Sequence, residues 1–123
     1  MKKIIVFVFL LSSLTHLNAQ TVNGVPVEDI PAKYVEIVAT SKMFKFFQVT
    51  IYLDYGQIGK MKEVKKGHII GEDGKPMIFN GVMGALNMLN KKGFNYLSQY
   101  TVTTSGANVY KILLENTNYK QKD

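Results

Sequence analysis

The chain of 123 residues contains no cysteine, no tryptophan and no arginine. Without cysteine it has no disulfide framework and no attachment point for a lipid anchor, so packing alone must hold the fold together. Without arginine it lacks the side chain that best binds phosphates and guanine edges through paired hydrogen bonds. Sequence-specific binding of nucleic acid is therefore not expected, although 15 lysines against 9 acidic residues give a net charge of +6.

Histidine is also scarce, since only His68 lies beyond the first 19 residues. A nucleophilic triad needs a positioned base, and zinc sites need several histidine or cysteine ligands. The segment Glu72-Asp73-Gly74 lacks the further acidic residues of a calcium loop and is typical of a turn. No pair of carboxylates has a spacing that indicates glycoside hydrolysis. We therefore expect no metal, no cofactor and no catalytic residue, and a binding protein is favoured over an enzyme.

The first 19 residues have the three parts of a cleavable export signal. Lys2 and Lys3 form a positive start, residues 4–14 form an apolar run, and Leu17-Asn18-Ala19 ends in a small residue that suits signal peptidase. The apolar run is too short for a membrane-spanning helix, so no stable membrane anchor is expected. We predict cleavage after Ala19 and a periplasmic or secreted protein, whose net charge falls by two to +4.

Alternating apolar residues predict two strands in the first half of the mature chain. Residues 34–40 alternate around Val35, Ile37 and Ala39, and residues 46–54 alternate around Phe47, Val49, Ile51 and Leu53. A link at 41–45 suggests that the two strands form a hairpin. Residues 20–31 are rich in turn residues, so they are interpreted as an extended lead-in that precedes a domain spanning residues 32–116.

The second half predicts a helix followed by two more strands. Apolar residues at helical spacing between Asn80, a suitable N-cap, and Gly93, a suitable stop, indicate an amphipathic helix of about three turns. Residues 94–104 and 109–115 then alternate as strands, and residues 117–123 form a polar tail, which we expect to be frayed. The order predicts an α+β fold: a two-layer ββαββ domain, in which one helix covers an antiparallel sheet of about four strands. Residues 68–70 and 77–79 could pair as a minor hairpin.

One face of such a sheet has no helix over it. Aromatic residues on an uncovered sheet usually indicate self-association or ligand contact. The side chains that we predict for this open face are Tyr34, Thr50, Tyr52, Tyr100 and Thr101.

The segment Ala85–Leu97 carries a Leu-Asn pair, a helix end, Gly93 and an aromatic residue. With strands expected on both sides, it resembles a widespread family of small bacterial domains of unknown function. The resemblance implies structural roles, with Gly93 as a left-handed helix stop and Phe94 as a plug between helix and sheet. Residues 34–38 and 54–57 also look like those of uncharacterised exported proteins from Gram-negative bacteria. Neither resemblance implies an activity.

The leading hypothesis is a non-enzymatic exported module of the cell envelope. It would associate with itself, as a homo-oligomer, or with an envelope protein, through the open face or an edge of the sheet. The alternative is a weak hydrolase or a binder of acidic glycans that uses the strand end at 54–57 and the lysine-rich segment 60–68. The candidate binding residues are Tyr52, Asp54, Tyr55, Gln57, Lys62, Lys65, Lys66, His68 and Tyr100.

Overall fold

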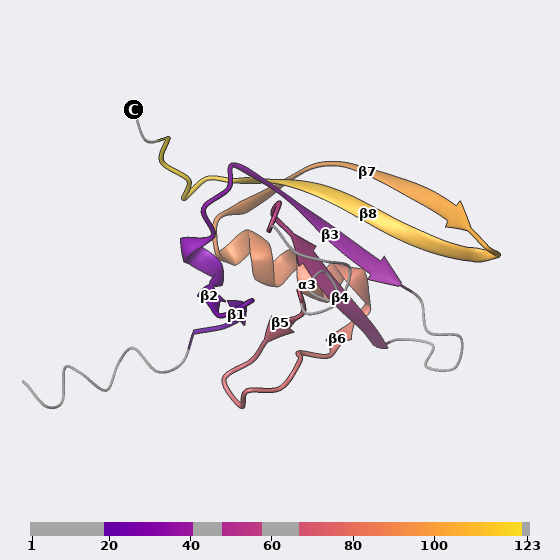
Figure 1. Cartoon of the computed structure of the whole chain (residues 1–123), viewed down its shortest axis with the longest axis horizontal. Coiled ribbons are helices and arrows are strands. Elements are labelled where there is room, and N and C mark those ends of the chain that lie inside the picture. Colours follow the sequence, from indigo (N-terminus) through magenta and orange to yellow (C-terminus); the bar gives the residue numbers. More distant parts are fainter. Residues whose placement is uncertain (1–18, 41–47, 58–66, 122–123) are drawn as a thin grey trace, which may run out of the picture.

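The computed structural model describes residues 19–40, 48–57 and 67–121 (Figure 1). Four long antiparallel strands form the main sheet in the order β4-β3-β8-β7, and the short strand β6 pairs with the outer side of β4. One helix, α3, packs against this sheet, which confirms the predicted α+β fold. The bounds are β3 Tyr34–Thr40, β4 Gln48–Asp54, β6 Phe79–Asn80, α3 Gly81–Lys91, β7 Phe94–Thr104 and β8 Ala107–Asn116.

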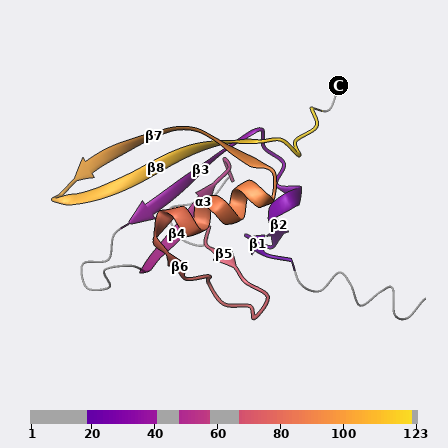
Figure 2. The same cartoon turned by 180° about the vertical axis from the view of Figure 1, so that it is seen from behind.

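The alternation of apolar residues sets which face of the sheet is buried. Ile37 of β3 lies opposite Leu53 of β4 and Ile112 of β8, and all three are buried on the side that α3 covers. Ala85 and Leu89 lie on the buried face of α3, and Phe94 is fully buried directly after the helix. The core therefore forms between α3 and one face of the sheet. Figure 2 shows α3 lying across the strands of the sheet.

The hairpin of β7 and β8 is longer and tighter than the sequence pattern predicted. Thr104 pairs with Ala107, so only Ser105 and Gly106 form the turn. Both have positive φ, 51° and 76°, as a type I′ turn requires. The tip of the hairpin projects beyond α3 in both views of the chain (Figures 1 and 2).

A β-bulge between Tyr96 and Ser98 corrects one assignment to the open face. The extra residue inverts the alternation of side chains along the rest of β7. Thr101 consequently lies opposite Tyr110, on the side of the sheet that faces α3, while Tyr100 lies opposite Lys111 on the other side. Thr50 keeps its predicted place in the strand, with its backbone opposite Thr40.

The segment interpreted as a lead-in belongs to the folded unit. Thr21–Val22 (β1) and Val25–Pro26 (β2) form a small hairpin, which β5 (Ile69–Ile70) extends to three strands. A short 3₁₀ helix follows at Val27–Asp29. The apolar side chains of this segment that are buried in the shared core are Val22, Val27 and Ile30.

The predicted minor pairing of residues 68–70 with 77–79 is present in a shifted register. Ile70 pairs with Pro76, and the Met77 N–H donates to the Ile69 carbonyl oxygen at 2.8 Å. Phe79, in contrast, pairs with Val49 in the main sheet. Across the described ranges, no helix is long and apolar enough to cross a membrane.

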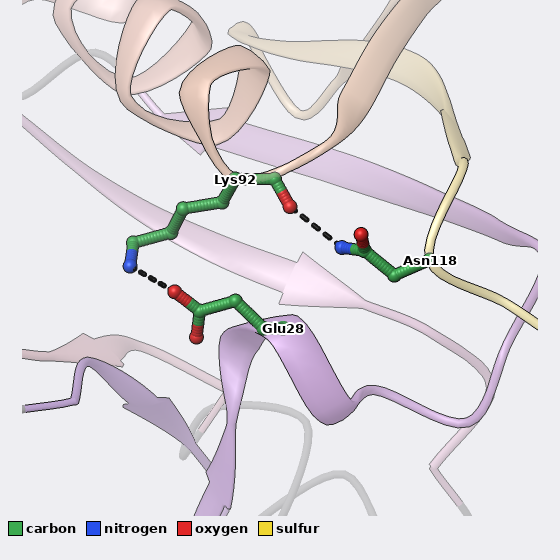
Figure 3. Close-up of polar contacts among 3 residues, drawn as sticks. All are labelled: Glu28, Lys92 and Asn118. Carbon is green, nitrogen blue, oxygen red and sulfur yellow. Dashed lines mark hydrogen bonds and ion pairs between the residues drawn. The ribbon is translucent and has the colours of Figure 1, made fainter. Parts of the chain in front are cut away.

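The C-terminal residues are not frayed where the chain leaves β8. Asn116 is buried, and its Nδ2 donates to the carbonyl oxygens of Ile30 at 3.1 Å and Ala32 at 2.9 Å. Asn118 Nδ2 donates to the Lys92 carbonyl oxygen at 2.6 Å, while the Lys92 amino group forms an ion pair with Glu28 (Figure 3). The end of β8 therefore ties the N-terminal segment to the end of α3.

Candidate functional site

The face of the sheet opposite α3 gathers two of the predicted aromatic residues. The register places Tyr52, Val38, Lys111 and Tyr100 in one row across β4, β3, β8 and β7. Directly opposed residues of an antiparallel pair share a face, so Tyr52 and Tyr100 lie on the same surface. Tyr34, also predicted for this face, lies opposite Glu115 and is 51% exposed. Tyr52 and Tyr100 therefore share the open face, but strands β3 and β8 lie between them.

Glu36 organises the polar groups of this face. Tyr100 Oη donates to Glu36 Oε2 at 2.9 Å, and Lys111 Nζ lies 3.0 Å from Glu36 Oε1. Hydrogen bonding to the Glu36 carboxylate raises the pKa of Tyr100 and also raises the pKa of Lys111. At neutral pH, Tyr100 is therefore a neutral donor and Lys111 a cation, and the carboxylate is shared between them. This arrangement holds Tyr100 in place and leaves no free general base in the group.

His68 lies at the outer edge of β4 beside Tyr52. The two residues form an isolated antiparallel bridge, and their ring centroids are 4.1 Å apart. His68 Nδ1 is buried and has no hydrogen-bond partner among the residues that the structure describes. Two of the predicted binding residues are thus brought into contact, and the contact between them is a stack of rings.

The strand end at 54–57 is a hydrogen-bonded corner. Asp54 Oδ1 accepts from the Gly56 N–H at 2.9 Å, and Gln57 Oε1 accepts from the Tyr55 N–H at 2.8 Å. Gln57 Nε2 donates to the Leu53 carbonyl oxygen at 2.9 Å and to Asn23 Oδ1 at 3.0 Å. The polar atoms of Gln57 therefore hold the corner and join it to the β1–β2 turn, while Tyr55 is half-buried against the core.

The predicted lysine cluster is not part of this geometry. Lys62, Lys65 and Lys66 lie outside the described residues. Within residues 19–40, 48–57 and 67–121, no group of three histidine, aspartate or glutamate residues is placed to hold a metal ion.

Strand β7 is an exposed surface of which the sequence pattern singled out only Tyr100 and Thr101. It is the edge strand of the main sheet, and every residue from Asn95 to Thr103 is exposed. Tyr96 is 50% exposed, Leu97 44% and Tyr100 48%. The signal was present in the sequence, because the chain carries no charged residue and no proline between Lys92 and Lys111.

A groove runs beside this edge on the side that faces α3. It has a volume of about 290 Å³. Residues of α3 form one wall, and the helix-facing side of the β7–β8 hairpin forms the other. The two walls include the side chains of Val82, Met83, Leu86, Gln99, Thr101 and Tyr110. The edge strand is therefore accessible from both faces of the sheet over the part that projects beyond the helix.

Comparisons with protein-family models, with curated proteins and with solved structures found no match. The resemblance of residues 85–97 to small bacterial domains of unknown function accordingly stays a prediction.

Proposed function

We propose that this protein is an exported, non-enzymatic binding module of the cell envelope that acts by adding an extended polypeptide strand to β7. The observation that carries the proposal is the uncharged, proline-free edge from Asn95 to Thr103, in which every residue is exposed. Export is supported by the signal-like pattern of residues 1–19.

An exposed edge strand presents unpaired N–H and C=O groups to any other strand. Proteins that avoid edge pairing shorten such strands or place lysine, proline or an inward-pointing charge on them. β7 has 11 residues and carries none of these side chains, and its single irregularity is the bulge at Leu97. Its composition of tyrosine, threonine and valine also favours extended backbone. The strand is therefore built to pair.

The hairpin turn identifies which backbone groups face the free edge. In a two-residue hairpin, the residues that flank the turn form a hydrogen-bonded pair, so the backbone of Thr104 faces β8. The direction alternates along an antiparallel strand. The N–H and C=O groups of Gln99, Thr101 and Thr103 consequently point away from β8 and are free to bind an added strand.

The test is a pair of substitutions at Thr101, in the middle of this edge. Proline removes the outward N–H group but is tolerated on an edge strand whose N–H faces solvent, whereas alanine keeps the N–H group. We expect mature wild-type protein and Thr101→Ala, purified gently from the native host, to show associated protein mass in native mass spectrometry. Thr101→Pro should lose most of that mass.

Urea unfolding of the purified variants serves as the control for folding. Thr101→Pro should unfold cooperatively and within about 1 kcal/mol of Thr101→Ala, because the change lies on the solvent side of the strand. Equal association of the proline and alanine variants would reject strand addition, as would a wild-type chain that carries no associated protein.

A further inference from the structure

We infer that the strand added to β7 is β7 of a second copy, paired antiparallel across a two-fold axis that passes through Thr101. This inference rests on the strand addition proposed above and specifies its partner. Two antiparallel edges related by such an axis would join two sheets into one continuous sheet.

The position of the axis follows from the limits of the regular edge. The bulge interrupts β7 before Ser98, and the hairpin turn begins after Thr104. Thr101 is the midpoint of the segment Ser98–Thr104, and its own N–H and C=O groups face the free edge. A two-fold axis there pairs Thr101 with Thr101 of the second copy, and Gln99 with Thr103 of the second copy. Each outward-facing backbone group of the regular segment then has a partner.

The side chains are compatible with this register on both faces. On the face opposite α3, Tyr100 lies opposite Val102 of the second copy. The two-fold axis generates the equivalent pair of Val102 with Tyr100 of the second copy. An aromatic residue opposite a β-branched residue is a favourable cross-strand pair. On the face toward α3, threonine lies opposite threonine, and both are exposed in the single chain. The paired segments contain no charged side chain.

The charge distribution favours a copy of this chain over a charged partner. The mature chain, without residues 1–19, would have a net charge of +4, yet the edge has no charged side chain. Two such edges meet without like-charge repulsion between directly opposed residues. An acidic or basic strand would find no counter-charge on β7, so its charges would gain no attraction from directly opposed residues of this edge.

The exposed area is of the size that a weak dimer needs. Within the paired segment, Tyr100 is 48% exposed and Val102 is 37% exposed. With the backbone of the edge, the segment offers on the order of a few hundred Å² per copy, which is the size of weak, transient interfaces. We therefore expect a dimer with a dissociation constant on the order of micromolar.

A charge exchange at the axis tests the inference. In homodimers of Thr101→Lys or Thr101→Glu, two like charges would be directly opposed, so each variant alone should dimerise at least about tenfold more weakly than wild type. A mixture of the two places lysine opposite glutamate. Sedimentation velocity and native mass spectrometry should therefore detect a Lys–Glu heterodimer, at least about tenfold tighter than either homodimer.

Thr103 provides the matched control. In the proposed register it lies opposite Gln99 of the second copy, so a mixture of Thr103→Lys and Thr103→Glu should gain nothing over the separate variants. A mixture of the Thr101 variants that dimerises no better than each alone would reject the axis through Thr101. Recovery by the Thr103 mixture would reject it as well.

The outcomes separate this inference from the proposed function. A purified wild-type chain that stays monomeric at about 100 μM, well above the expected dissociation constant, overturns pairing between copies. If an envelope protein is nevertheless bound by Thr101→Ala and lost in Thr101→Pro, strand addition stands and the partner is that protein. If both variants behave alike, the proposed function fails too.

Discussion

Replacement of Asn116 by alanine should be among the most destabilising single changes at the end of the chain. The Asn116 carboxamide is 2% exposed and makes three hydrogen bonds: two donated by Nδ2, and one accepted by Oδ1 from the Asn118 N–H at 3.0 Å. Alanine removes all three bonds. The Ile30 carbonyl oxygen keeps a second donor, the Ala32 N–H at 2.9 Å, but the Ala32 carbonyl oxygen loses the donor that Asn116 Nδ2 supplies.

The expected loss follows from these contacts. Each net hydrogen bond contributes about 1 kcal/mol, and leaving the partly buried Ala32 carbonyl oxygen unpaired adds up to about another. We therefore expect Asn116→Ala to lower the free energy of unfolding by about 3 to 4 kcal/mol. For a domain of this size, with a urea dependence of about 1.5 kcal/mol per molar, the midpoint falls by about 2 M.

Urea unfolding followed by circular dichroism measures this change, and Asn118→Ala is the matched control. Asn118 is exposed and its side chain makes one hydrogen bond, to the Lys92 carbonyl oxygen, so its loss should cost about 1 kcal/mol. If Asn116→Ala and Asn118→Ala had equal midpoints, the argument that the buried carboxamide ties the N-terminal segment to β8 would be refuted.

Two further changes test the contacts around Lys92. The ion pair with Lys92 lowers the pKa of Glu28 below 4.5, so Glu28→Gln should lose under about 1 kcal/mol at pH 7. Because the pKa of Glu28 is lower in the folded than in the unfolded chain, the ion pair stabilises the fold at a pH above the unfolded pKa. In urea unfolding, the stability of the wild type relative to Glu28→Gln should therefore fall as the pH drops through the folded pKa. Gly93 has φ of +93°, and an added Cβ would lie 2.8 Å from the Asn118 side chain, whereas Gly81, with φ of +78°, has open space there. Thermal unfolding should show that Gly93→Ala costs about 2 to 3 kcal/mol and Gly81→Ala about 1 kcal/mol. An equal cost at both sites would contradict the close approach of Asn118.

The strands of the main sheet and the helix could be predicted because the period of apolar residues that indicates each of them lies within the segment itself. Alternating apolar residues placed β3, and residues 94–104 were predicted with the bounds that β7 has. The helix was predicted between Asn80 and Gly93, although Asn80 makes no side-chain capping bond.

What the sequence missed depends on contacts between distant segments. The spacing of Val22, Val27 and Ile30 follows neither the period of a strand nor that of a helix. These residues are buried only because the N-terminal segment packs against the core. The bulge at Leu97 has no local pattern, and it moved Thr101 to the other face.

The candidate site was predicted in part for the same reason. Alternation was enough to place Tyr52 on the uncovered face, whereas Tyr100 reaches that face only because of the bulge, and the neighbours of both residues come from other strands. The contact of Tyr100 with Glu36 spans 64 residues, so only the register of β3, β8 and β7 brings the two together. The pairing capacity of β7 was visible as a long uncharged stretch, but the strand order was needed to show that it forms an edge.

The contact of Asn116 with Ile30, 86 residues away, also sets the order in which the chain can fold. Strand β3 lies between β4 and β8, so one of its two sides stays unpaired until β8, at the end of the chain, has been synthesised. Strand pairing of this kind is slow, because the chain loses the entropy of closing a long loop before the new contacts stabilise the fold. A nascent chain therefore lacks its closing strand until residues 107–116 have been synthesised. Such a delay would suit the export proposed above, because a translocation channel accepts a polypeptide that has not yet folded.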